Sequence, residues 1–372
     1  MGQLRGLALL GAMAGLMAPV GLANAETSSW ESRVDGPAAP IEKKPAAASP
    51  AKGWGPVKII KTTPGPAEKA APPAASPPRP ASTHVNTPAL VDDAAYDAFD
   101  NGLYLTALDL GVKAAERGDP QAHTLVGRIY AEGLGVANNA EVAAQWFARG
   151  AQLGDPEAMF AYGVMLAEGR GVDKDRTEAG RYFEAAAARK HALANYNLAL
   201  LFLRGDGKPE NPYRAFMHMR YAAESGVPAA QYDLGTMFAT GTGVNPNAFE
   251  AAKWIGKAAA AGHQEAQLDY ALILFRGHGV PPDPTRGAAY FRRAAERGVA
   301  TAQNRLARCY VHGAGVDKDL VEAAKWNFIA RAGGIEDEGL DKLLAKLSSG
   351  ERAKAQVAAQ QWRDRISVGF LE

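Results

Sequence analysis

The chain of 372 residues carries 41 basic and 40 acidic side chains, so its formal net charge is only +1. This balance excludes the strong basic excess of a general nucleic-acid-binding protein. The single cysteine, Cys309, excludes a disulfide framework and a cysteine-rich zinc or iron–sulfur site. Beyond the extreme N-terminus, no run of about 18 apolar residues predicts a membrane span.

The first 25 residues have the features of a secretory signal peptide. Arg5 supplies a positively charged start, an apolar run follows over residues 7–22, and Ala23-Asn24-Ala25 gives the small–x–small pattern of a cleavage site. The sequence therefore predicts export, with a mature chain that begins at Glu26 and is periplasmic or secreted. The alternative is an uncleaved membrane anchor, which the short apolar run disfavours.

Residues 26–90 are predicted to form a disordered tether rich in Pro, Ala and Lys. Thirteen of the 23 prolines lie between Pro37 and Pro88, and this segment contains seven basic residues and two acidic ones. Proline favours extended polyproline II, so such a segment behaves as a semi-rigid spacer. We expect either a solvated linker or a weak contact of this basic tether with anionic polymers of the cell envelope.

A short apolar island interrupts the tether at residues 53–61, with the sequence GWGPVKIIK. Its Trp54 and the β-branched pair Ile59-Ile60 are typical of a docking motif that adds a strand to a partner. The same residues would equally pack back on the folded body or have no role.

The rest of the chain repeats with a period of 36 residues. Six rows align without a gap, and they begin at Gly118, Gly154, Lys190, Gly226, Gly262 and Gly298. Every row has alanine four residues in: Ala122, Ala158, Ala194, Ala230, Ala266 and Ala302. Every row then has a Gly-x-Gly: Gly133 and Gly135, Gly169 and Gly171, Gly205 and Gly207, Gly241 and Gly243, Gly277 and Gly279, Gly313 and Gly315. An Asn or Asp column follows: Asn139, Asp175, Asn211, Asn247, Asp283 and Asp319. Such a period indicates a stacked array rather than independent domains.

Each column has a physical reason. Apolar and small residues recur with helical spacing after the alanine, and a small residue nine positions into the row lets a second helix approach closely. The first glycine of each pair stands where this helix ends, because glycine readily adopts the left-handed conformation. The Asn or Asp column is predicted to cap a second helix, and Glu178, Glu250 and Glu322 complete capping boxes. The second helix then carries an aromatic residue, except in row three, which has His218.

These columns resemble the Sel-one-like repeat (SLR) family, relatives of the tetratricopeptide repeat with a longer, glycine-marked turn. Row four, AAQYDLGTMFATGTGVNPNAFEAAKWIGKAAAAGH, shows the pattern best, and the resemblance covers about residues 94–349. It implies an all-α fold, a right-handed α/α solenoid of six 36-residue helix–turn–helix repeats. We expect the solenoid at residues 91–333, with a preceding hairpin over 94–117, and a C-terminal helical cap at 334–372.

No catalytic site, cofactor or metal site is predicted. The Gly-x-Gly pairs lack the preceding strand and third glycine of a nucleotide loop. The seven histidines share no metal-ligand spacing, and His191 and His263 are interpreted as solvated turn residues. Cys309 falls in an apolar column and is interpreted as a buried residue. Some cysteine-rich members of the resembled family have been linked to β-lactam hydrolysis. Here the only Ser-x-x-Lys, residues 49–52, lies in the tether, so an enzyme is the least favoured hypothesis.

The candidate binding residues lie on the faces of the first helices that packing does not use. In the related tetratricopeptide solenoids the first helices line a concave groove. The predicted groove residues of rows three to six are Asn197, Arg204, Asp233, Asp269, Arg276, Arg305, Arg308 and His312. The last rows present a basic cluster beside two carboxylates, which suits an acidic or extended polypeptide. The alternative is an ordinary solvated helix face.

The sequence thus predicts a non-enzymatic adaptor that holds partner proteins in the bacterial cell envelope. Exported members of the resembled family include regulators of membrane sensor kinases and factors in polysaccharide secretion, so the resemblance suggests a role of that kind. The alternative is a module that binds cell-wall or exported polysaccharide, which aromatic platforms on the groove would favour. No nucleic-acid partner, no cofactor and no transmembrane span of the mature chain are expected.

Overall fold

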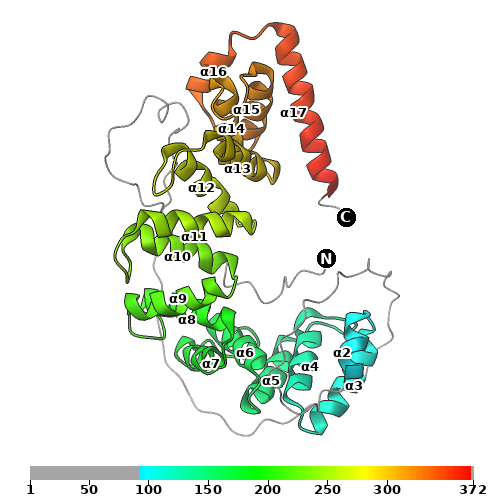
Figure 1. Cartoon of the computed structure of the whole chain (residues 1–372). Helices are drawn as coiled ribbons and strands as arrows, with labels where there is room; N and C mark the ends of the chain where they lie inside the picture. Colours follow the sequence, from blue (N-terminus) through cyan, green and yellow to red (C-terminus); the bar gives the residue numbers. More distant parts are fainter. Residues whose placement is uncertain (1–92, 370–372) are drawn as a thin grey trace. The chain divides into compact units, whose positions relative to one another are not determined.

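The structure, a computed structural model, describes residues 93–369, and this part of the chain is entirely α-helical (Figure 1). The helices are α2 (Asp93–Asp100), α3 (Tyr104–Glu116), α4 (Pro120–Glu132), α5 (Ala140–Gln152), α6 (Pro156–Glu168), α7 (Arg176–Ala188), α8 (Ala192–Arg204), α9 (Pro212–Glu224), α10 (Pro228–Thr240), α11 (Ala248–Ala260), α12 (Gln264–Arg276), α13 (Pro284–Glu296), α14 (Ala300–His312), α15 (Leu320–Ala332), α16 (Glu338–Leu344) and α17 (Ser349–Gly369). The predicted all-α solenoid of helix–turn–helix repeats is confirmed. The predicted signal peptide, the tether and its 53–61 island lie outside the described residues.

The described helices form two compact units. The N-terminal unit holds α2–α9 and ends at Ser225, whereas the C-terminal unit holds α10–α17 and begins at Gly226. Within each unit every helix of a repeat packs against the next helix in the chain, so the pairs stack as successive repeats. The division falls between rows three and four, a boundary that the equal rows did not predict. Between residues 93 and 369, no helix combines the length and the apolar character that a bilayer crossing requires.

The first glycine of each pair ends the first helix of its repeat, as predicted. In all six repeats this glycine has φ between 64° and 78°, the left-handed region, and in α6 the Gly169 N–H donates to the Met165 carbonyl at 2.8 Å. The Asn or Asp column then caps the second helix in every repeat. Asn139, for example, accepts from the Val142 N–H at 3.0 Å.

The second glycine is required by a contact with the neighbouring repeat, which was not predicted from the sequence. A Cβ at Gly171 would lie 2.2 Å from the carbonyl oxygen of Ala140, and one at Gly279 would lie 2.1 Å from that of Ala248. Both contacts are to backbone, which cannot move aside as a flexible side chain does. The turn therefore rests on the start of the second helix in the preceding repeat, so the Gly-x-Gly column marks a contact between repeats as well as a helix end.

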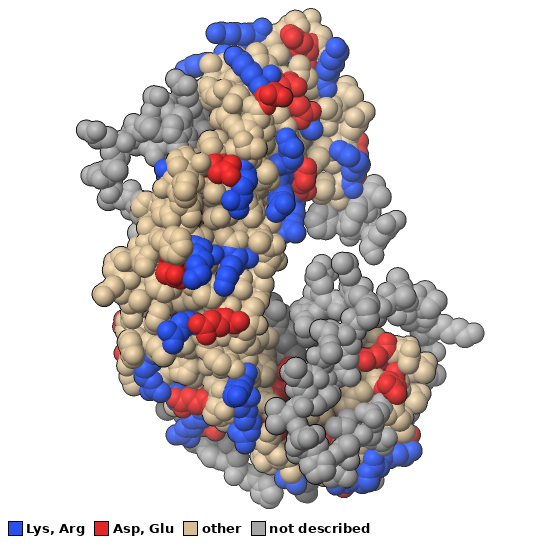
Figure 2. All heavy atoms as spheres, viewed as in Figure 1, with Lys and Arg blue, Asp and Glu red and all other residues tan. Residues whose placement is uncertain are grey.

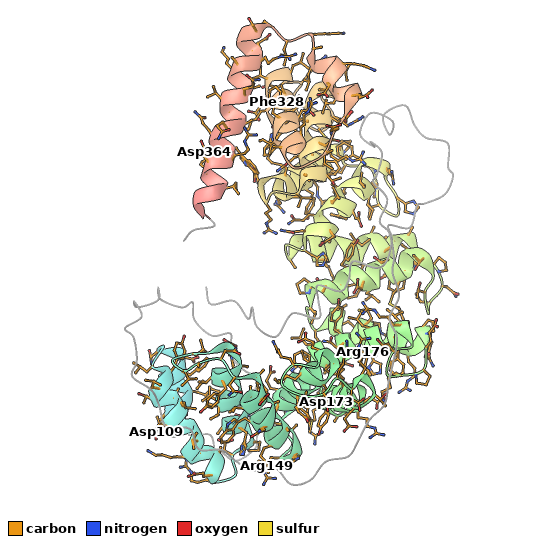
Figure 3. The ribbon with its side chains drawn as sticks, turned by 180° about the vertical axis from the view of Figure 1, so that it is seen from behind. Asp109, Arg149, Asp173, Arg176, Phe328 and Asp364 are labelled. Atoms are coloured by element: carbon orange, nitrogen blue, oxygen red, sulfur yellow. The ribbon has the colours of Figure 1, made fainter. Side chains whose placement is uncertain are left out.

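The core of each repeat forms where small residues let two helices approach. The alanine column is buried in every repeat, with exposed fractions of 2% or less. At the small ninth position, a Cβ on Gly127 would lie 2.9 Å from the Phe147 ring, and one on Gly163 would lie 2.8 Å from the Phe183 ring. The predicted close approach of the second helix is confirmed, and side chains fill the space between the paired helices (Figure 3).

The capping boxes predicted at Glu178, Glu250 and Glu322 form only in part. Each glutamate backbone N–H donates to its cap residue, but the N–H of the cap residue already donates to a carbonyl of the first helix, as Asp175 does to Leu166 at 2.9 Å. No donor remains for the glutamate carboxylate, which instead pairs with a cation on its own helix. In each repeat, the hydrogen bond from the cap residue N–H to the first helix thus takes the place of the bond from that N–H to the glutamate carboxylate in a capping box.

The two ends of the array also follow the sequence expectation. Helices α2 and α3 form the predicted hairpin before the first full repeat, and α16 and α17 form the C-terminal cap. In α17, Ala355 and Ala359 are buried, and Trp362 packs edge-to-face on Trp326 of α15, with 5.7 Å between ring centroids. The last repeat of the C-terminal unit is thereby covered by a helix of its own chain.

Candidate functional site

His191 and His263 are N-caps of first helices, which corrects their interpretation as solvated turn residues. The His191 Nδ1 accepts from the Ala194 N–H at 3.1 Å, and His263 caps α12 in the same way. Each ring stacks on an aromatic residue of the preceding repeat, Phe160 at 4.7 Å and Tyr232 at 4.8 Å between centroids. An imidazole nitrogen that accepts a hydrogen bond must be unprotonated, and burial lowers the pKa of His263 accordingly.

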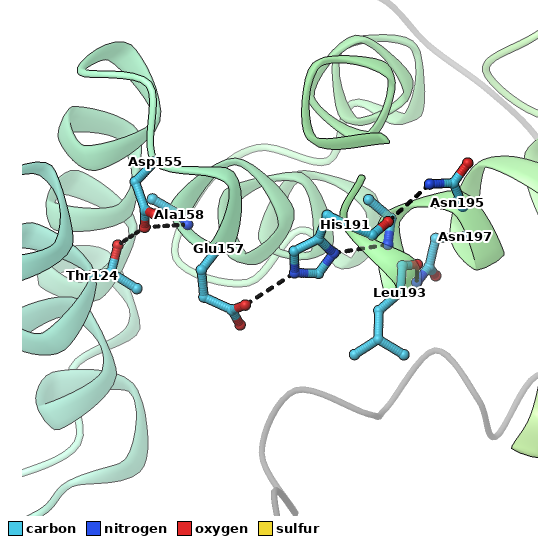
Figure 4. A network of polar contacts seen from close by, with 9 residues as sticks. Thr124, Asp155, Glu157, Ala158, His191, Leu193, Asn195 and Asn197 are labelled. Carbon is cyan, nitrogen blue, oxygen red and sulfur yellow. Dashed lines mark hydrogen bonds and ion pairs between the residues drawn. The ribbon is translucent and has the colours of Figure 1, made fainter. Parts of the chain in front are cut away.

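Polar contacts also join the repeats of the N-terminal unit (Figure 4). The Thr124 hydroxyl of α4 donates to the Asp155 carboxylate, which also accepts from the Ala158 N–H at 3.0 Å. Glu157, on the same helix as Ala158, pairs with the Nε2 of His191 at 2.9 Å. Burial raises the pKa of Asp155 despite these donors. The contacts fix the spacing between successive repeats and leave no open site at this position.

In the C-terminal unit, Tyr232 and Asp269 form an equivalent contact between α10 and α12. The Tyr232 hydroxyl donates to Asp269 at 2.8 Å, and burial raises the pKa of both groups. Arg276, about two turns further along α12, lowers the pKa of Asp269 and partly offsets this effect. Asp269 was predicted as a groove ligand, but its carboxylate is largely buried and already accepts a bond from the chain itself.

Arg308 is committed to an ion pair, so it differs from the free cation that the sequence predicted. Its Nε and Nη2 lie 2.7 and 2.6 Å from Oδ2 of Asp337, and the two side chains are 12% and 6% exposed. Asn304 donates to the same oxygen at 2.9 Å, and Asp337 caps α16 by accepting from Leu340. Burial opposes ionisation of Asp337, yet the donors from Asn304, Leu340 and Arg308 together hold its pKa below the ordinary value. This cluster anchors the cap to the last repeat.

The other predicted groove residues differ in their exposure. Asn197 is buried, at 5% exposed, and donates to the Leu193 carbonyl at 2.9 Å, so it does not lie on an open face. Arg204 and Arg276 are exposed at the ends of α8 and α12. Asp233, Arg305 and His312 are half-buried. Asn197 and Arg204 belong to the N-terminal unit and the other predicted residues to the C-terminal unit.

A small pocket lies in the N-terminal unit beside the predicted residues Asn197 and Arg204. It is lined by Ala167, Arg176, Phe183, Asn197, Leu200, Leu201, Arg204 and Asp206. Two of these lining residues, Arg176, which is labelled in Figure 3, and Asp206, form an ion pair. The free space is about 20 Å³, which is enough for one water molecule but not for a cofactor or a substrate.

The remaining titratable groups give no sign of a reactive centre within the described residues. Between residues 94 and 366, no three side chains of His, Cys, Asp or Glu come close enough together to hold a metal ion. Cys309 is fully buried, and burial raises its pKa to about 12, so the thiol stays protonated at neutral pH. This burial confirms the structural interpretation of Cys309.

The contacts between repeats were not predicted from the sequence. Tyr232 and Thr124 stand six residues into their rows, a column of mixed residue types, so no pattern singled them out. Gln267 and Gln303 share another column and were also missed. Each is 2% exposed and donates to the last carbonyls of the preceding second helix, to Ala259 and Ala295 respectively. The recurrence of glutamine in one column was a signal that periodicity alone could have found.

Comparisons with known proteins agree with this architecture. Residues 120–155, 156–191, 192–227, 228–263, 264–299 and 300–326 each match the Sel1 repeat, in the register of the 36-residue rows. The crystal structure of a Sel1 repeat protein from Oxalobacter formigenes is similar, with 29% identity, a TM-score of 0.56, and coverage of 66% of this chain and 96% of that one. Another similar structure is c5321, a protective antigen of uropathogenic Escherichia coli with an SLR fold. It has 27% identity, a TM-score of 0.47, and coverage of 70% of this chain and 64% of that one. No curated protein matches the chain.

Sel1 repeat proteins are scaffolds for protein–protein interaction and typically lack enzymatic activity. Six consecutive matches cover more than half of the sequence, and each coincides with one helix pair of the structure. The chain therefore belongs to the Sel1 repeat family.

Proposed function

We propose that this protein is an exported adaptor that binds protein partners in the bacterial cell envelope through the first helices of its C-terminal unit. The observation that carries the proposal is the array of two arginines and one histidine on α12 and α14. Arg276 ends α12, and Arg305 and His312 lie on the equivalent helix of the next repeat. The two helices contribute to one hydrophobic cluster, so their spacing is fixed.

An acidic or extended polypeptide fits such a surface. Guanidinium groups bind carboxylates through two parallel hydrogen bonds, and arginine is among the residues that most often dominate binding energy at interfaces. Arg308 does not take part, because its guanidinium group already forms an ion pair with Asp337. Asp269 is likewise engaged by Tyr232, so this one of the two carboxylates expected beside the cations opposes an acidic ligand less strongly than the sequence alone implied.

Export and the envelope role complete the proposal. The signal pattern of residues 1–25 supports export, and the tether would set the reach of the repeats. Regulation of an envelope sensor or of polysaccharide secretion is the proposed biological context. Mass spectrometry of the protein isolated from its host should give an N-terminus at Glu26, and retention of residues 1–25 would contradict cleavage.

The test of the binding surface is crosslinking in the cell followed by purification of the chain from the envelope fraction. We expect a discrete acidic protein partner, with at least tenfold less recovered when Arg276→Glu and Arg305→Glu are combined, since interface arginines contribute upwards of about 1 kcal/mol each. The matched control is Arg286→Glu with Arg293→Glu on α13, which makes the same charge change on exposed second-helix positions.

Equal recovery of the partner by both double variants would contradict the proposed surface. Recovery of glycan without protein would contradict the adaptor function and favour a polysaccharide-binding module. Arg308 is left unchanged in both variants, because its removal would leave Asp337 buried without its counterion.

A further inference from the structure

The C-terminal end of α2 carries negative charge that no neighbouring side chain neutralises. Asp97 and Asp100 lie in the last turn of this helix, both are exposed, and the turn contains no basic residue. Neither carboxylate forms an ion pair with a residue in the described part of the chain. Carboxylates at this position are unfavourable, because the helix dipole already places partial negative charge at a C-terminus.

The hydrogen-bonding groups at this end are satisfied, so the unmet requirement is charge alone. The Asp97 carbonyl accepts from the Asn101 side chain at 2.7 Å, and the Ala98 carbonyl accepts from the Leu103 N–H at 2.8 Å. Arg128 lies beside α2 but is already engaged, because its guanidinium group lies over the Phe99 ring and pairs with Glu132 at 2.7 Å.

Apolar surface adjoins these carboxylates. Leu103 directly follows the α2 turn and is 58% exposed, and Leu105 in the first turn of α3 is 47% exposed. Leu105 lies partly against the turn of the first full repeat, because a Cβ at Gly135 would come within 3.5 Å of its Cγ, so Leu103 is the more exposed of the two leucines. The α2–α3 end therefore combines exposed leucines with two carboxylates, a surface suited to a segment that is both basic and apolar.

We propose that residues 52–61 of the same chain bind this surface, which we call the α2 end (Asp97, Asp100, Leu103 and Leu105). The segment has the sequence KGWGPVKIIK, with a cation at each end and one in the middle, and with Trp54 and Ile59-Ile60 between them. Its charges complement Asp97 and Asp100, and its apolar side chains complement the two leucines. This assignment uses the 53–61 island as an intramolecular ligand.

Residues 52–61 are covalently connected to α2 through the chain, so a weak contact is sufficient to keep them at the α2 end. Thirty-one residues separate Lys61 from Asp93, and a semi-rigid, proline-rich chain of that length spans on the order of 50 Å on average. The effective concentration of the segment at the α2 end is then on the order of millimolar, so even a contact of millimolar affinity is substantially occupied. Because lysine–carboxylate attraction at a surface is screened by salt, occupancy should fall as ionic strength rises.

The test uses the full chain labelled with 5-fluorotryptophan and followed by ¹⁹F NMR. The chain has six tryptophans, and the Trp54 signal is assigned from a Trp54→Phe variant. We expect the Trp54 resonance to lie away from the random-coil position and to return to it in 0.5 M salt. We also expect amides of α2 to exchange with solvent about five- to tenfold faster once the contact is removed.

Charge reversal on either side should remove the contact, and reversal on both should restore it. Lys58→Glu with Lys61→Glu, or Asp97→Lys with Asp100→Lys, moves the Trp54 resonance to the random-coil position, and the four changes together move it back. Lys43→Glu with Lys44→Glu is the matched control within the tether and leaves the resonance unchanged. A Trp54 resonance already at the random-coil position in the unaltered chain would overturn the proposal, as would an unchanged resonance in Asp97→Lys with Asp100→Lys.

Discussion

At the scale of single residues, the rows differ from one another mainly where one repeat meets the next. The row-start position is glycine in five of the six rows and Lys190 in the third, and Lys190 has φ +66°, the left-handed conformation of its glycine counterparts. A residue with a Cβ is strained in that conformation by about 1 kcal/mol or more. The repeat geometry thus imposes a backbone conformation on a residue that does not favour it.

Replacement of Lys190 by glycine should therefore stabilise the protein. We expect Lys190→Gly to raise the free energy of unfolding by about 1 kcal/mol, less the entropy that glycine loses on folding, measured by urea unfolding followed by circular dichroism. Lys190→Ala is the control, because it removes the same side chain but keeps the strained Cβ. A gain as large in the alanine variant would show that the lysine side chain, and not the backbone, is responsible.

The histidine caps make part of the stability depend on pH. Burial lowers the pKa of His263 below its unfolded value of about 6.5, so the folded state binds fewer protons than the unfolded state in this range. The contribution of His263 is therefore fully present above pH 6.5 and is lost as the pH falls below it. His218, whose pKa burial also lowers, acts in the same direction.

We expect the urea concentration at the unfolding midpoint to decrease as the pH is lowered from 7.5 to 5.5. We expect His263→Asp to weaken this pH dependence. Aspartate caps the equivalent helices at Asp119 and Asp155, so the variant keeps a side-chain acceptor for α12 and removes the imidazole. An unchanged pH dependence in His263→Asp would show that His263 does not titrate with unfolding.

At the scale of elements, the least regular part of the chain depends on one buried cluster. Helix α16 follows the last matched repeat and has only seven residues, too few to be stable alone. Asp337 caps it while accepting from Arg308 and Asn304 of α14, so the helix forms because the repeat before it supplies partners. The Arg308 that resembled a ligand-binding residue is in this way a structural one.

Loss of Asp337 should be costly, because Arg308 would stay buried without its counterion. We expect Asp337→Ala to destabilise the C-terminal unit by about 3 kcal/mol, and hydrogen exchange should show the loss in α16 and α17. Glu338→Ala is the control: this neighbouring carboxylate is 91% exposed, and its pair with Lys342 is 3.8 Å long. Equal effects of the two variants would contradict a special role for the buried pair.

At the scale of the whole molecule, the periodicity of the sequence predicted most of the architecture. The spacing of alanine, Gly-x-Gly and Asn or Asp gave the helix boundaries, because each column has a local cause: packing of a small residue, a left-handed helix end, or an N-cap. The left-handed helix end and the N-cap act within one helix pair, so a sequence in which they recur six times specifies the helix boundaries of every pair. The alanine column and the second glycine instead contact the preceding repeat.

The candidate site was harder to predict, because its exposure depends on contacts between repeats. Helical spacing correctly placed Arg276 at an exposed helix end, but it could not show that Asn197 is buried or that Arg308 is held by a residue from a later row. Likewise, nothing in the spacing distinguishes a capping imidazole such as His263 from a solvated one.

The sequence by itself determined the repeat, its period and its helix ends, since these follow from the conformational preferences of individual residues and from helical spacing. Only the tertiary structure decided which polar side chains remain for a partner. Burial and pairing are set where one repeat packs on the next, and the residues that meet there, such as Tyr232 and Asp269, stand 37 positions apart in the chain. The 36-residue period alone does not indicate which of the many side chains separated by that many positions are in contact.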